Sequence, residues 1–68
     1  MRADKVELSW DSAKNKWLVR IQVGEEVIRR HCNLKKDADE QTLLAAATQT
    51  ARDEGYEVDR PQITVHTA

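Results

Sequence analysis

The chain has 68 residues, a net charge of −1 and one cysteine, which indicate a single small domain over residues 1–68 without an internal disulfide. No stretch approaches the roughly 20 apolar residues of a membrane-spanning helix, and a reducing cytoplasm is the expected location. The balanced charge argues against a nucleic-acid binder of the uniformly basic type.

The first half of the chain predicts three consecutive strands. Val6–Trp10 and Trp17–Val23 alternate apolar and polar residues, as strands with one buried face do. The polar stretch Asp11–Lys16 forms the turn between them. Gly24–Glu25 predicts a two-residue hairpin, because glycine adopts the positive φ that such a turn needs. The third strand is Val27–Leu34.

The second half predicts one helix from Lys35 to Tyr56. Asp37 is the expected N-cap, with Glu40 three residues later completing a capping box. Gly55 is expected to end the helix in a left-handed conformation. The helix carries an apolar stripe at helical spacing: Leu43, Leu44, Ala47 and Ala51.

A fourth strand is expected over Gln62–Thr67, after Pro61. The order β-β-β-α-β then favours an α+β, two-layer sandwich with one helix packed on one face of a mostly antiparallel four-stranded sheet. A right-handed crossover places the last strand parallel to the first or to the third strand. The favoured strand order is 4-1-2-3, which makes the third strand an edge.

The two turns fix the strand registers. Trp10 is expected opposite Trp17, and Arg20 lies between Glu7 on one side and Arg29 on the other. Both registers place the same set on the face toward the helix: Val6, Leu8, Trp10, Trp17, Val19, Ile21, Ile28, Cys32 and Leu34. This agreement supports the predicted sheet, because a slip of one residue would invert a strand.

The third strand contains two arginines, a histidine and the cysteine, and the alternation of a strand separates them. Arg29 and His31 point away from the helix, whereas Arg30 and Cys32 point toward it. Arg30 is expected to extend past the helix rim, to meet a helix carboxylate or stack on Trp17, and to guard the edge against aggregation. The opposite directions of His31 and Cys32 exclude a nucleophilic pair between them.

The face away from the helix is the candidate binding face. It gathers basic groups that could face an anion: Lys5, Lys16, Arg20, Arg29 and His31. The alternative is a solvated surface on which Glu7 neutralises the Arg20–Arg29 pair, since like charges directly opposed on a sheet are destabilising.

No enzyme activity is expected, because the sequence offers no nucleophile–base pair, no metal-ligand set and no phosphate-binding glycine loop. No catalytic residue, metal, cofactor or small-molecule substrate is predicted, and no membrane partner. We expect an interaction module that forms a homo-oligomer or binds a protein partner through the open sheet face or an edge strand. Association would add buried area to a small core. The alternative function is binding of nucleic acid or another polyanion through the outer sheet face.

That alternative draws on a resemblance. Lys16–Ile21, Val27–Arg30 and the alanine-rich helix to Gly55 resemble the AP2-type and integrase arm-binding domains, over roughly residues 5–55. The resemblance implies a three-stranded sheet backed by a helix that reads DNA with its exposed face, with Arg20, Arg29 and Lys16 toward the groove. The chain is also similar to small uncharacterised bacterial domains with a tryptophan strand, a hairpin, an alanine-rich helix and a final strand, which imply no activity.

Overall fold

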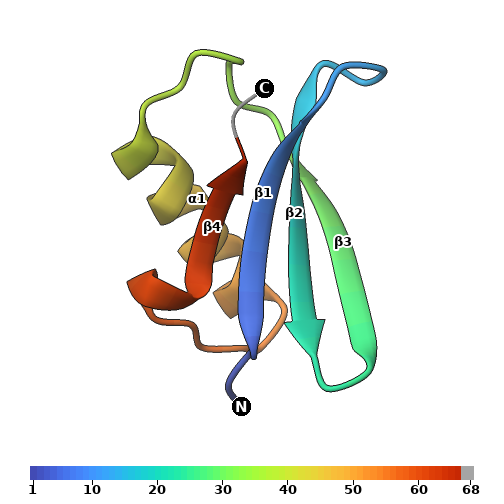
Figure 1. Ribbon diagram of the computed structural model, residues 1–68, viewed down its shortest axis with the longest axis vertical. Helices are drawn as coiled ribbons and strands as arrows, with labels where there is room; N and C mark the ends of the chain where they lie inside the picture. Colours follow the sequence, from blue (N-terminus) through green and yellow to red (C-terminus); the bar gives the residue numbers. More distant parts are fainter. Residues whose placement is uncertain (67–68) are drawn as a thin grey trace.

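The computed structural model describes residues 1–66 and shows a four-stranded sheet with one helix on one face (Figure 1). The elements follow one another along the chain as strands β1 (Lys5–Asp11), β2 (Lys16–Val23) and β3 (Glu26–Cys32), helix α1 (Glu40–Asp53), the short 3₁₀ helix η1 (Arg60–Gln62) and strand β4 (Ile63–His66). The predicted α+β sandwich is confirmed. The end of the predicted fourth strand, Thr67, lies outside the described residues.

The sheet has the order β3-β2-β1-β4, so the predicted order and the edge position of β3 are confirmed. β1 and β3 both pair antiparallel with β2, whereas β4 lies parallel to β1. The crossover through α1 therefore ends beside the first strand, and not beside the third. The two hairpin turns use positive φ at Asn15 (53°) and at Gly24 (61°), and the latter confirms the glycine hairpin.

The core lies between the sheet and α1. Val6, Leu8, Val19 and Ile21 are completely buried, and α1 contributes Leu43, Ala47 and Ala51. Leu44, predicted for the same helix stripe, is only half-buried. The small alanine side chains let the helix lie close to the strands. At one end of the core, Trp10 and Trp17 meet edge to face with their ring centroids 5.7 Å apart.

The start of the helix differs from the prediction. α1 begins at Glu40, and its N-cap is Asp39, whose Oδ1 accepts a hydrogen bond from the Thr42 backbone N–H at 2.8 Å. Asp37 is therefore not the cap, and Glu40 is the first helical residue instead of the capping-box partner. The residues after Lys35 form a turn in which the Ala38 N–H donates to the Lys35 carbonyl at 3.1 Å, because the chain must first leave the sheet edge.

The end of the helix agrees with the prediction. Gly55 has a φ of 88° and its N–H donates to the Arg52 carbonyl at 2.9 Å. The Tyr56 N–H reaches back to the Ala51 carbonyl at 2.8 Å, which completes a Schellman motif.

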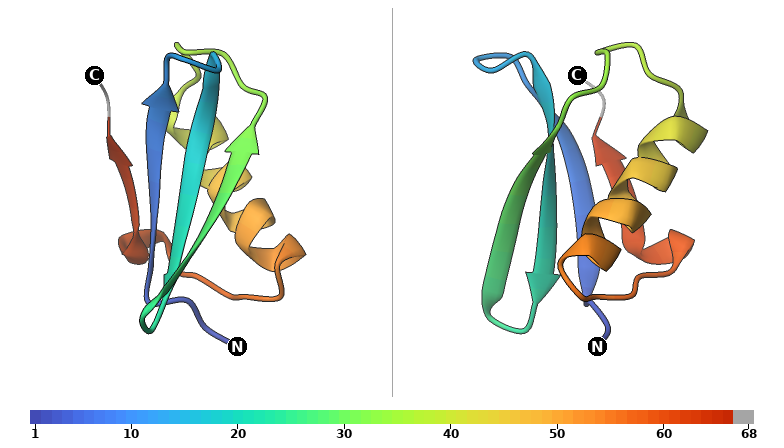
Figure 2. Two further views of the ribbon diagram at one scale, coloured as in Figure 1. Left: turned by 90° about the vertical axis from the view of Figure 1, so that its right-hand side faces the viewer. Right: turned by 180° about the vertical axis from the view of Figure 1, so that it is seen from behind.

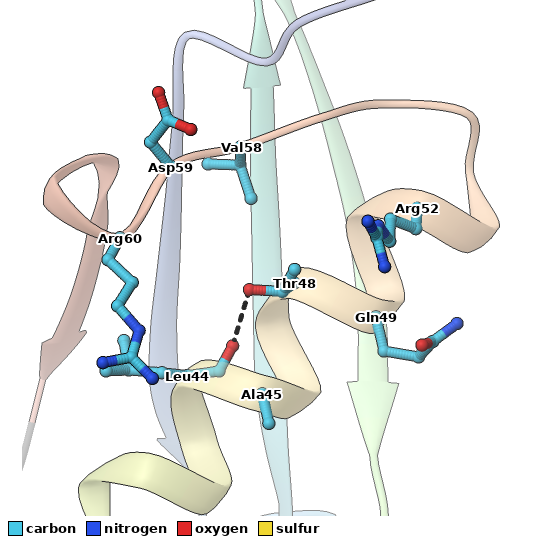
Figure 3. A pocket seen from close by; sticks show the side chains of 8 residues that line it. All are labelled: Leu44, Ala45, Thr48, Gln49, Arg52, Val58, Asp59 and Arg60. Carbon is cyan, nitrogen blue, oxygen red and sulfur yellow. Dashed lines mark hydrogen bonds between the residues drawn. The ribbon is translucent and has the colours of Figure 1, made fainter.

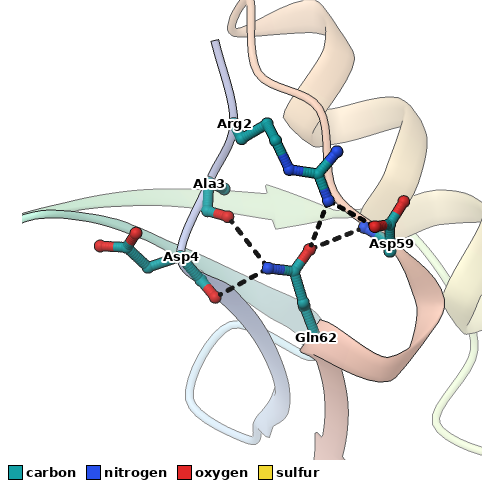
Figure 4. A network of polar contacts seen from close by, with 5 residues as sticks. All are labelled: Arg2, Ala3, Asp4, Asp59 and Gln62. Carbon is teal, nitrogen blue, oxygen red and sulfur yellow. Dashed lines mark hydrogen bonds and ion pairs between the residues drawn. The ribbon is translucent and has the colours of Figure 1, made fainter.

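The N-terminal segment is tied to the chain that leads into β4. The Ala3 N–H donates to the Glu57 carbonyl at 2.9 Å, and Ala3 itself is buried. Figure 4 shows Arg2 held between the side chains of Asp59 and Gln62, while the Gln62 amide reaches the backbone of the N-terminal segment. These contacts fix the start of β4 beside the start of β1.

Helix α1 does not cover the sheet evenly. It packs mainly on β1, β4 and β2, and the right-hand view of Figure 2 shows β3 at the edge of the sheet, to the side of the helix. Ile28 and Cys32, the apolar residues of β3 that point toward the helix side, are accordingly only half-buried.

Candidate functional site

The open face of the sheet is the surface away from α1, and all five predicted binding residues lie on it. Lys5 belongs to β1, Lys16 and Arg20 to β2, and Arg29 and His31 to β3. The predicted row across the sheet is confirmed, because Arg20 pairs with Glu7 of β1 and with Arg29 of β3.

Each carboxylate of this face lies beside a histidine. Asp11 Oδ2 is 3.1 Å from His31 Nε2, and Glu7 Oε2 is 2.8 Å from His66 Nε2. The hydrogen bond from His66 holds the pKa of Glu7 below its ordinary 4.5, against the opposing effect of burial. The hydrogen bond from His31 lowers the pKa of Asp11 in the same way.

The two carboxylates of the open face therefore lie closer to other groups than to the central arginines. Among the described residues, neither Arg20 nor Arg29 forms an ion pair, whereas Glu7 is also 3.6 Å from Lys5 Nζ. The half-buried Leu18 and Val27 lie on the same face. The open face thus carries an excess of basic groups, and the Arg20–Arg29 row lies between Leu18 and Val27.

The β3 edge is the second candidate surface, and the register shows which of its backbone groups are free. The Gln22 carbonyl accepts a hydrogen bond from the Asp4 N–H at 2.8 Å, so the backbone of Gln22 faces β1. Its partner Val27 is then in a non-hydrogen-bonded pair, and the N–H and C=O of Val27 point away from the sheet. By alternation, the backbone groups of Arg29 and His31 also point outward.

Arg30 covers the middle of this edge. Its Nη2 is 2.6 Å from Glu54 Oε1 at the end of α1, and its Nη1 donates to the outward Arg29 carbonyl at 2.8 Å. The predicted contact with a helix carboxylate is confirmed, and this arginine does not stack on Trp17. The pair is held loosely, because 51% of the Arg30 side chain is exposed.

Cys32 and His31 lie on opposite sides of the sheet, as predicted. Cys32 is half-buried, with its Sγ 3.3 Å from Thr50 Oγ1 of the helix, whereas His31 contacts Asp11 on the open face. These two side chains therefore form no thiol–imidazole pair.

A shallow groove of about 480 Å³ lies between α1 and the segment that leads into η1. Figure 3 shows Val58 above Thr48, with Arg60 and Arg52 toward the two ends and the Asp59 carboxylate turned away from the helix. Asp59 pairs with Arg2 instead. Sequence reasoning missed this groove, because it depends on how the segment after Gly55 packs on the helix. The pairing of His66 with Glu7 was missed for the same reason, since it needs the parallel register of β4.

Residues 1–66 contain no group of three or more metal-ligating side chains and no helix long and apolar enough to cross a membrane. Comparison with protein-family models, curated proteins and solved structures found no match to this chain. The geometry of the open face and of the β3 edge is therefore the basis for assigning a function.

Proposed function

We propose that this chain is a non-enzymatic protein-interaction module of the cytoplasm that adds a strand from a partner to the β3 edge. The observation that carries the proposal is the row of outward backbone groups at Val27, Arg29 and His31 on a strand of seven residues. Such a row hydrogen-bonds readily to an extended chain, and pockets beside it select the side chains of that chain.

Side chains next to the edge support the same function. Ile28 and Cys32 are half-buried on the helix side, because α1 is centred over the other strands. An added strand would cover them with alternate side chains of its own. The gain in buried apolar area matters in a domain of this size, which buries only about 60% of its unfolded surface.

Arg30 makes the edge selective. An inward-pointing charge on an edge strand disfavours indiscriminate pairing. A partner strand must displace the Arg30 guanidinium from the Arg29 carbonyl and offer an acid in place of Glu54. We therefore expect partners that carry a carboxylate opposite Arg30.

Selection of displayed random peptides on the immobilised protein tests this function. Val27→Pro removes an outward N–H without touching the bonds to β2, and Val27→Ala is the matched control that keeps the N–H. We expect selected peptides to be extended and acidic, to bind wild type and Val27→Ala, and to lose binding to Val27→Pro. Failure to select any peptide, or equal binding to both variants, would contradict the proposal.

Binding of nucleic acid by the open face is the second candidate. It is favoured by Arg20 and Arg29, whose positions lie opposite each other without an ion pair in the described part of the chain. The proposal predicts duplex binding that weakens steeply with salt and falls on Arg20→Ala or Arg29→Ala, while Arg52→Ala in the groove has no effect. A low-salt titration with duplex DNA that gives no signal would exclude it.

A further inference from the structure

The strand that best fits the β3 edge is β3 of a second copy of the same chain. Resting on the proposed strand-adding function, we infer that β3 pairs antiparallel with β3 of a second copy, with Ile28 on the twofold axis. The two sheets would then form one continuous sheet of eight strands.

The backbone groups fit this register. In an antiparallel pair, residues with outward N–H and C=O groups face each other and exchange two hydrogen bonds. With Ile28 opposite Ile28, Val27 of one copy faces Arg29 of the second copy, and both residues have outward backbone groups. Symmetry repeats the pair on the other side of the axis.

The side chains on the helix side also fit. Ile28 of each copy would cover the other, which buries the half-exposed apolar surface that α1 leaves open. Two residues from the axis, Glu26 of one copy lies opposite Arg30 of the second copy. Glu26 is exposed and forms no ion pair within residues 1–66, so it is free to take the guanidinium from Glu54. Opposite charges directly across a strand pair stabilise it.

Neighbouring registers lack this complementarity. Centring the pair on Arg29 sets two arginines against each other on the open face, and centring it on Arg30 does the same on the helix side. Centring it on Val27 leaves only Glu26–Ile28 of the strand in the ladder, because Gly24–Glu25 form the turn. Arg30 therefore disfavours pairing in registers that place no acid opposite it. It favours the register that places Glu26 of the second copy there.

The contact rests on one strand from each copy and is therefore small. Interfaces of this kind fall below the roughly 1,200 Å² of stable complexes, so we expect a weak, concentration-dependent dimer. Association requires the Arg30 hydrogen bond to the Arg29 carbonyl to break, and the Arg29 carbonyl then accepts from the Val27 N–H of the second copy.

Sedimentation equilibrium of the full chain from micromolar to millimolar concentration tests the register through a charge exchange. Glu26→Lys places a lysine opposite Arg30 of the second copy, and Arg30→Glu places a second glutamate opposite Glu26. We expect each variant alone to associate at least about tenfold more weakly than wild type. An equimolar mixture of the two variants should recover dimers, because both contacts are then between opposite charges.

Arg30→Glu also breaks the ion pair with Glu54 and so could weaken folding. Recovery of dimers in the mixture would show that the variant is folded and that its weaker association alone comes from the charge contact. Glu57→Lys, which makes the same charge change at an exposed side chain between α1 and η1, is the matched control and should dimerise like wild type. A monomer at every concentration, or a mixture no more associated than its components, would overturn the inference. Peptide binding that depends on the Val27 N–H would still support the strand-adding function in that case.

Discussion

Strands β1 and β3 are both seven residues long and both pair with β2, yet their surroundings differ. β1 has β4 on its other side and α1 above it, and its Val6 and Leu8 are completely buried. β3 has no neighbour on its outer side within residues 1–66, and Ile28 stays half-buried. The same central strand thus supports one neighbour that holds the fold together and another that is available for binding.

The largest expected difference between the two strands is in their apolar side chains. Leu8→Ala should reduce the free energy of unfolding by about 2–5 kcal/mol, because it leaves a cavity in a closed core. Ile28→Ala should cost roughly half as much, because its site is already partly open to water. Urea denaturation of both variants measures the difference, and equal losses would show that β3 is as well covered as β1.

Proline substitutions separate the two sides of β3 itself. Ile28→Pro removes an N–H that faces β2 and should cost roughly 2 kcal/mol or more. Val27→Pro removes an outward N–H and should cost less than about 1 kcal/mol. The same urea measurements check this prediction. A larger loss in Val27→Pro than in Ile28→Pro would mean that the outward groups were wrongly assigned.

Capping of α1 acts on the helix that covers β1 and leaves β3 largely open. Asp39→Ala should lower the Tm by a few degrees, because the Thr42 N–H loses its acceptor. Asp37→Ala is the matched control at the position that the sequence pattern favoured, and it should leave the Tm nearly unchanged. If calorimetry shows a larger fall in Tm for Asp37→Ala than for Asp39→Ala, Asp37 is the cap.

The smallest expected effect is on the pH dependence of stability, through Glu7 of β1. The lowered pKa of Glu7 contributes stability above its ordinary value of 4.5, and this contribution is lost as the pH falls through the lower folded-state pKa. Glu7→Gln should therefore reduce the loss of stability between about pH 5 and pH 2. Thermal unfolding across this range, with Glu25→Gln as control, measures it. A wild-type acid slope in Glu7→Gln would mean that the hydrogen bond from His66 has no effect in solution.

The sequence was sufficient to predict the parts of the fold that depend on local chemistry. Alternation and the two turns determine the registers of β1, β2 and β3, and Gly55 ends the helix as expected. The true cap, Asp39, lies two residues beyond a second aspartate, and the local sequence pattern does not distinguish them. The path of the loop after β3 determines which of the two aspartates caps the helix.

The candidate site was predictable only in part for a similar reason. The cations of the open face follow from alternation, and so does the inward direction of Arg30. The pairing of His66 with Glu7 requires the parallel register of β4, which contacts between distant segments set. The hydrogen bond from Arg30 to the Arg29 carbonyl likewise depends on Glu54 at the end of α1, whose position is set by the packing of the helix on the sheet.

Residue-resolved amide hydrogen exchange at low and high protein concentration tests the role of the β3 edge most directly. In dilute solution, the Val27 and Arg29 amides should exchange rapidly while those of Ile28 and Arg30, which face β2, are protected. At high concentration, the Val27 and Arg29 amides should become protected as well. If both amides stay unprotected at every concentration, or if the new protection falls on α1 instead, β3 does not pair with a second copy in this register.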